Sequence, residues 1–244
     1  MSLFTKKISI LCFLSILFAF CAHSEAVKWI SSDSVWSIQS GVTFETDKNL
    51  NLDSVPVNLM AGFSLSQFQV LTGIQAQTSI FDFSGSLIYA PTFFNRLSIG
   101  FKSLFHLKHY AAEYLEIDFM QGLYAMYRLN RRLAFDSDFS LHMKFSQIYS
   151  IEDSMPWVKS NSFSFRFETL FNPIEDFTMS LGVASYTMFR YNLFFAPNYW
   201  LGAEYQFADM FSIGTKALVE YVDMYTLSAN RRLFDFEVYV KLEL

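Results

Sequence analysis

The chain has 244 residues, a length that suits one domain or two small ones. Its residues are 52% hydrophobic and 19% aromatic, only 17% are charged, and this composition excludes disorder for most of the chain. The formal net charge of -5 provides no basic surface of the kind that binds nucleic acid, so we expect no nucleic-acid partner.

Residues 1–26 are predicted to be a signal peptide. Lys6 and Lys7 form a positive start, residues 8–22 are almost wholly apolar, and Ser24-Glu25-Ala26 has small residues where a signal peptidase reads them. A membrane-anchoring helix would need about 20 apolar residues, which this run does not reach. We therefore expect cleavage after Ala26 and a mature chain of residues 27–244.

A lipoprotein signal ending at Cys21 is a second alternative. Phe20 opposes it, because such signals have a small residue directly before the acylated cysteine. Cleavage after Ala26 would remove both Cys12 and Cys21, which excludes a disulfide framework and cysteine-based sites in the mature chain.

Beyond residue 26 the chain has no continuous apolar run of 18 residues, so a membrane-spanning helix is not expected. Its main pattern is an alternation of apolar and polar residues with period two, which predicts strands whose two faces meet different solvents. We predict twelve strands, near residues 35–46, 57–66, 68–76, 80–90, 97–108, 114–128, 133–146, 162–171, 177–190, 199–207, 211–221 and 233–244.

The alternation is clearest in the last predicted strand. One of its faces carries Phe234, Phe236, Val238, Val240, Leu242 and Leu244. The opposite face carries Asp235, Glu237, Tyr239, Lys241 and Glu243. In the last eight strands, all 18 Asp, Glu, Lys and Arg residues share a face opposite the large apolar side chains.

The apolar faces are rich in Phe and carry Tyr near the strand ends, at Tyr89, Tyr127, Tyr191, Tyr199 and Tyr221. Aromatic rings at strand ends are favoured at a bilayer interface, and strands of this length match a tilted crossing of the hydrocarbon. Lipid cannot satisfy an open sheet edge. The predicted fold is therefore all-β: a transmembrane antiparallel up-and-down β-barrel of about 12 strands.

Short and long connections are expected to lie at opposite ends of this barrel, as in outer-membrane barrels. The short ones include Leu129–Arg132, Pro173–Asp176 and Ala208–Met210, and the longer ones include Asp47–Pro56, Gln147–Asn161 and Asp223–Arg232. The connection at Gln77–Ser79 is too short for its expected end, so ten or fourteen strands also fit.

In its signal peptide, its amphipathic strands and a final strand that runs to the last residue, the chain resembles the bacterial outer-membrane β-barrel class, which includes porins. The resemblance covers the mature chain and rests on pattern, without a motif of one family. It implies an outer-membrane location, contact with lipid and assembly by the barrel-assembly machinery, and it leaves the oligomeric state open. Members of this class commonly end in an aromatic residue, whereas this chain ends in Leu244.

The polar face is predicted to line the lumen of the barrel. The lumen residues expected from this phase are Lys102, His106, Lys108, Glu116, Asp118, Arg128, Asp136, Asp138, His142, Lys144, Arg166, Glu168, Arg190, Glu204, Lys216, Glu220, Asp235, Glu237, Lys241 and Glu243. Opposite charges in a narrow barrel can pair and fill the interior, or they can line a wet channel that selects solutes.

Other chemistry has little support in the sequence. Asp136, Asp138, Ser140 and His142 share one face of a strand, but residues two apart lie roughly 7 Å from each other, too far for a nucleophile and its base. His106 and His109 do not share a face, and no phosphate loop or dinucleotide motif occurs. We therefore expect no catalytic residue, metal or cofactor.

The expected function is a passive, porin-like channel for small solutes. Side chains can fill the interior of an eight-stranded barrel completely, whereas a twelve-stranded barrel encloses more space. No long insertion that could act as a plug is predicted. The alternatives are a structural or surface-interaction barrel acting through residues 47–56, 147–161 and 222–232, and, third, an outer-membrane hydrolase.

Overall fold

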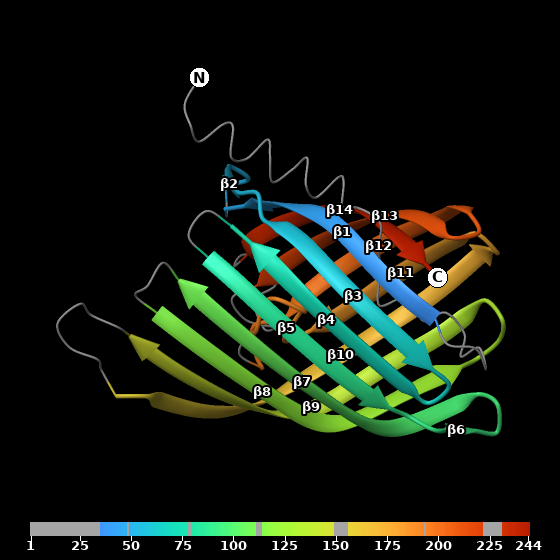
Figure 1. The fold of residues 1–244 in the computed structure, drawn as a ribbon, viewed down its shortest axis with the longest axis horizontal. Helices are drawn as coiled ribbons and strands as arrows, with labels where there is room; N and C mark the ends of the chain where they lie inside the picture. Colours follow the sequence, from blue (N-terminus) through green and yellow to red (C-terminus); the bar gives the residue numbers. More distant parts are fainter. Residues whose placement is uncertain are drawn as a thin grey trace.

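The structure is a computed structural model that describes residues 35–47, 49–77, 80–110, 114–148, 156–192, 194–221 and 231–244. Within these ranges, twelve strands form a closed antiparallel barrel, and two short strands, β2 and β6, extend it (Figure 1). The predicted signal peptide lies outside the described residues. The strands are β1 (Val35–Thr46), β2 (Leu52–Ser54), β3 (Val57–Leu65), β4 (Phe68–Ala76), β5 (Ile80–Tyr89), β6 (Thr92–Phe93), β7 (Leu97–Tyr110), β8 (Tyr114–Arg128), β9 (Leu133–Ile148), β10 (Val158–Ile174), β11 (Phe177–Ala184), β12 (Asn198–Ala208), β13 (Phe211–Tyr221) and β14 (Arg231–Glu243).

The barrel closes where the last strand pairs with the first. Each long strand pairs with its neighbours in chain order, and β14 pairs with β1 from Ser37↔Glu243 to Thr46↔Phe234. Two backbone hydrogen bonds between Trp36 and Leu244, of 3.0 and 2.8 Å, complete the seam. No sheet edge is left along the wall, so the prediction of a twelve-stranded up-and-down barrel is confirmed.

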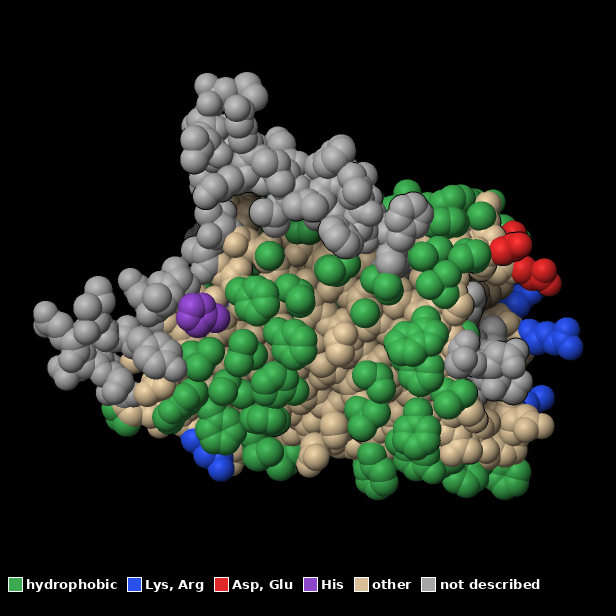
Figure 2. Space-filling view, viewed as in Figure 1, with side chains coloured by type: hydrophobic (Ala, Val, Ile, Leu, Met, Phe, Trp, Pro, Cys, Tyr) green, Lys and Arg blue, Asp and Glu red, His purple; other side chains and the backbone are tan. Residues whose placement is uncertain are grey.

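Large apolar side chains cover the outside of the barrel, and charged side chains are buried inside it. On β9, Phe139 and Leu141 are exposed, whereas Asp138, Ser140 and His142 are buried. Figure 2 shows hydrophobic side chains over the wall and charged ones toward its two ends. This arrangement inverts that of a soluble protein and matches a barrel surrounded by lipid.

No helix of the length and apolarity required to cross a membrane occurs among the described residues.

One end of the barrel holds the short turns, at 66–67, 94–96, 129–132, 175–176 and 209–210. Both ends of the barrel sequence lie there too, because Val35 pairs with Ser64 beside the first turn and Glu243 N donates to Met210 O beside the last. The predicted separation of short and long connections is therefore confirmed. The short connection that broke the pattern lies at the long-loop end, and Gln77 N donates to Ile80 O across it.

The ninth predicted strand, 177–190, was drawn too long. Strand β11 ends at Ala184, and residues after it leave the wall. Tyr191, expected on the lipid-facing side, lies inside the barrel against His106. The apolar and polar faces exchange phase at residues 185–188, and beyond Ser185 side chains of this part of the chain bond across the lumen, as Tyr186 does to Asp138 and Arg190 to Glu45.

Candidate functional site

Residues Ser185–Asn192, here called the inward segment, fold into the barrel. Ser185 holds the departure point, since its backbone N–H donates to Phe165 O and its hydroxyl accepts from Phe165 N, both at 3.0 Å. A bridge between Tyr186 and Tyr191 closes the segment, and their rings stack with centroids 6.1 Å apart. The sequence predicted no long insertion that could act as a plug, and it did not predict that this short segment turns inward.

One side of the inward segment packs against the wall formed by β5, β7, β8 and β9. The Tyr191 ring stacks on His106 at 4.5 Å between centroids, and its hydroxyl lies 3.3 Å from Ser84 Oγ. The Tyr186 hydroxyl donates to Asp138 Oδ2 at 2.5 Å. These contacts fill this half of the lumen.

The tip of the inward segment reaches β3 and β4, on the far side of the lumen from β11, where the segment begins. Phe189 packs against Met60 and Leu71, with Met188 beside them. Its ring lies over Gly73 of β4, where a Cβ atom would come within 2.7 Å of the ring. Glycine at this position therefore makes room for the segment.

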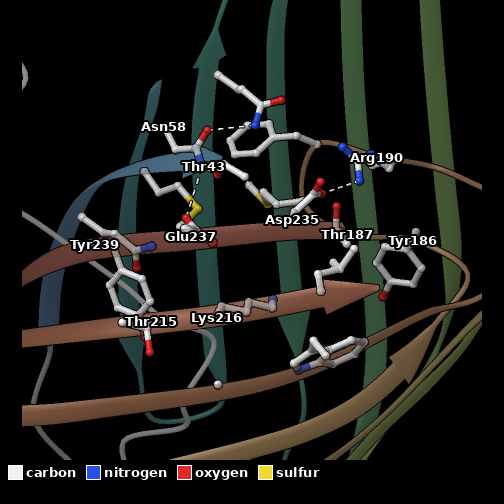
Figure 3. Close-up of a pocket in the computed structure, with 18 of the residues that line it drawn as sticks. Thr43, Asn58, Tyr186, Thr187, Arg190, Thr215, Lys216, Asp235, Glu237 and Tyr239 are labelled. Carbon is white, nitrogen blue, oxygen red and sulfur yellow. Dashed lines mark hydrogen bonds and ion pairs between the residues drawn. The ribbon is translucent and has the colours of Figure 1, made fainter. Parts of the chain in front are cut away.

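Arg190 anchors the segment to a third part of the wall. Its guanidinium contacts Asp235 at 2.6 Å, Glu45 at 2.8 Å and Glu220 at 3.7 Å, on β14, β1 and β13. Figure 3 shows Arg190 directed toward Asp235. With contacts on several sides, the inward segment narrows the lumen at this level.

A cavity of about 210 Å³ remains beside the inward segment. Its lining comes from β1, β3, β4, β5, β7 and β10 to β14 and from Tyr186–Arg190 of the segment. The amide of Asn58 and the hydroxyl of Thr43 face it together with charged groups (Figure 3), and Gln75 also lines it. These groups can exchange hydrogen bonds with water or a polar solute.

Trp200 lines the cavity and is surrounded by charged groups. Its indole N–H donates to Glu168 Oε1 at 3.0 Å, and Lys216 Nζ and the Arg166 guanidinium lie 5.0 and 5.5 Å from its ring. Gly182 lies under the ring, since a Cβ atom there would be 2.1 Å from Trp200. Trp200 was not predicted as a site residue, because a lone Trp on a polar face has no local partner that would mark it.

Several predicted lumen residues lie on this cavity. They are Lys108, Arg166, Glu168, Arg190, Glu204, Lys216, Asp235 and Glu237. Glu45 and Asp82 also line it and were missed, although each alternates in phase with the polar face of its strand. Lys241, which bonds to Glu204 at 2.6 Å and Glu243 at 2.8 Å, lies next to the cavity, and Glu220 lies near Arg190.

The remaining predicted residues, apart from Arg128, form buried networks in the filled half of the lumen. Lys102 pairs with Asp138 at 2.9 Å, and Tyr124 donates to Asp136 at 2.5 Å. Lys144 pairs with Glu116 at 2.5 Å. In this half of the lumen, the opposite charges pair with one another and fill the interior, as the first of the two interpretations of the lumen charges expected.

Histidines join two of the carboxylates in the same half. His106 lies between Asp118 at 3.1 Å and Asp82 at 3.2 Å, and His142 Nε2 lies 2.6 Å from Asp118. The donor atoms of His106, Glu116 and Asp118 lie within 4.8 Å of one another, which is metal-ligand spacing. Each is already engaged with a neighbouring side chain, so the arrangement reads as a polar network.

The hydroxyl near His142 belongs to Ser162, whose Oγ lies 3.3 Å from Nδ1. Ser140, the predicted partner in the hydrolase alternative, makes no such contact among the interactions described here. Neither serine lines the cavity. The acid, histidine and hydroxyl are therefore close together, away from the space that a solute could enter.

Arg128 is separated from the other predicted lumen residues. It lies at the short-turn end with Arg96 and Arg131, in a pocket shared with Asn95 and Asn130. Its backbone N–H donates to Arg96 O at 2.7 Å, which ties the two neighbouring turns together.

No family model matches the sequence, and no curated protein matches it. Solved structures do match the fold. A NanC porin structure aligns with a TM-score of 0.62 and 9% identity, covering 85% of this chain and 100% of that one. A KdgM porin in complex with disordered oligogalacturonate aligns with a TM-score of 0.55 and 12% identity, covering 86% and 98%. The chain therefore has the fold of outer-membrane porins.

Proposed function

We propose that the protein is a passive pore of a bacterial outer membrane, through which small solutes diffuse past the inward segment. The observation that carries this proposal is the polar cavity beside a segment that narrows the barrel without filling it. A lumen filled entirely by paired charges would have left no such space. The porin fold supports the same function.

The remaining parts of the proposal concern how the pore reaches the membrane. Residues 1–26 would direct export and be removed, and the barrel-assembly machinery would insert the mature chain. The outward apolar side chains would contact lipid, and the short turns would face the periplasm, as in other outer-membrane barrels. We propose no catalytic role.

Conductance across a planar bilayer tests the proposed function. Purified, refolded protein should produce discrete steps of current, whereas detergent buffer and heat-unfolded protein should not. Liposome swelling with sugars of increasing size then measures the size limit of passage, and we expect monosaccharides to pass and long oligosaccharides to be excluded because the inward segment narrows the lumen. Folded protein without conductance or swelling would overturn the proposal.

A further inference from the structure

The charges around the cavity carry an inference that rests on the proposed function and specifies its substrate class. We propose that the pore passes small cations in preference to anions. The cavity is lined by the carboxylates of Glu45, Asp82, Glu168, Glu204, Asp235 and Glu237. Among the residues that the structure describes, the basic side chains that line it are Lys108, Arg166, Arg190 and Lys216. The described lining is therefore acidic overall.

The acidic surplus is greatest where the inward segment narrows the lumen. Arg190 is the basic side chain of that segment, and three carboxylates surround it, at 2.6 Å from Asp235, 2.8 Å from Glu45 and 3.7 Å from Glu220. Asp235 and Glu45 alone bring two negative charges to the single positive charge of Arg190. An ion that passes this level therefore meets a net negative potential.

The other basic groups of the cavity also have acidic neighbours. Lys108 lies 3.5 Å from Asp82, and Arg166 is hydrogen-bonded to Glu168. Lys216 stands opposite Glu237 in the register of β13 and β14. An entering anion would have to compete with these carboxylates for each cation, whereas an entering cation would meet the surplus carboxylates.

The aromatic rings of the cavity give no advantage to an anion. Lys216 lies 5.0 Å from the Trp200 ring centroid, and Lys102 lies 5.2 Å from that of Tyr186. The ring faces attract positive charge, and here they already hold the ammonium groups of the protein itself. They add nothing that would favour an anion.

One pocket at the short-turn end has the opposite charge. Arg96, Arg128 and Arg131 line a pocket there that is separate from the cavity. Salt screens exposed charges over a Debye length of about 10 Å at 0.1 M, whereas charges in a narrow, half-buried space are screened less. We therefore expect the cavity, and not this end, to set the selectivity.

The reversal potential of single channels in a ten-fold KCl gradient tests the inference. We expect K⁺ to be roughly two to five times as permeant as Cl⁻, the range for one or two uncompensated charges about 8 Å from the ion, partly screened by salt. Absence of channels would overturn the proposed function. Channels with equal or greater permeability to Cl⁻ would leave that function standing and overturn the cation preference.

A charge-neutralising variant locates the selectivity. Glu237→Gln keeps an oxygen that can accept the hydrogen bond from Asn58, now 3.1 Å long, and should lower the K⁺ to Cl⁻ ratio by roughly half. Glu45→Gln is a second variant in case the first folds poorly. Glu175→Gln, exposed in a short turn, makes the same charge change away from the cavity and should leave the ratio unaltered. Equal effects of the cavity and turn variants would contradict the proposal.

Discussion

Tyr191 stacks on His106 with 4.5 Å between ring centroids and 26° between ring planes. This contact joins the inward segment to β7, whose His106 is in turn held by Asp118 and Asp82. A mobile tyrosine would block the lumen only transiently. A stacked and hydrogen-bonded one holds the constriction in a fixed place.

Tyr191→Ala should therefore widen the pore. The variant loses the stack on His106 and the contact of the hydroxyl with Ser84, so the inward segment is held less tightly. We expect larger single-channel conductance with greater current noise. Tyr205→Ala, which truncates a tyrosine on the outer face, is the matched control and should conduct like the natural protein. Identical conductance in all three proteins would show that the segment does not limit flow.

Gly182→Ala should destabilise the barrel. The new Cβ atom would lie 2.1 Å from the Trp200 ring, so the ring must leave its place, at a cost of about 1 to 3 kcal/mol. At Gly85 a Cβ atom would meet nothing closer than 3.9 Å, so Gly85→Ala should be neutral or slightly stabilising. Urea unfolding in lipid vesicles measures both, and equal midpoints would argue against the packing described for Trp200.

The buried pair of Lys102 and Asp138 predicts a second contrast in stability. The Lys102 side chain is 6% exposed and that of Asp138 is 0% exposed, so Lys102→Met would leave a buried carboxylate without its cation and cost about 3 to 5 kcal/mol. Lys144, 31% exposed beside Glu116, is the control: Lys144→Met should cost less than about 1 kcal/mol. A similar cost for both would mean that water reaches the Lys102 pair.

The outer face should reject charge according to depth. Phe139 lies in the middle of β9 and points outward, so Phe139→Arg should destabilise the protein in vesicles by about 2 to 4 kcal/mol. Leu129→Arg, in a short turn, should have an effect of about 1 kcal/mol or less. Equal urea midpoints for the two variants would place Phe139 outside the hydrocarbon.

Much of the wall could be predicted from the sequence because strand phase is a local property. Every second residue faces lipid, so runs such as Phe135 to Leu141 identify both the strand and its two faces. The predicted start of the last strand at Leu233 lies within two residues of the observed start at Arg231. The lengths of the connections then predicted which of them lie at the same end of the barrel.

The inward segment could not be predicted in the same way. The phase of β11 inverts directly after Ala184, since Ser and Thr occupy the apolar-face positions 185 and 187 while Tyr and Met occupy the polar-face positions 186 and 188. The prediction overlooked this inversion because Phe189, Arg190 and Tyr191 return to the original phase, and the inversion marks only where the wall strand ends. What draws the segment inward is distant in the chain: the Tyr186 bond to Asp138 spans 48 positions and the Arg190 bond to Glu45 spans 145. Periodicity contains no information about such partners. For the same reason, the sequence did not predict that Ser162 lies close to His142.

Neighbouring residues on β4 allow the most direct test of the arrangement, since Ile74 is exposed on the outer wall and Gln75 lines the cavity. Both natural cysteines, Cys12 and Cys21, lie in the predicted signal peptide, so the mature chain can carry a single introduced thiol. In lipid vesicles, a charged, membrane-impermeant thiol reagent should label Gln75→Cys and spare Ile74→Cys. Labelling of Ile74→Cys with protection of Gln75→Cys would contradict a lipid-facing apolar wall around a water-filled lumen.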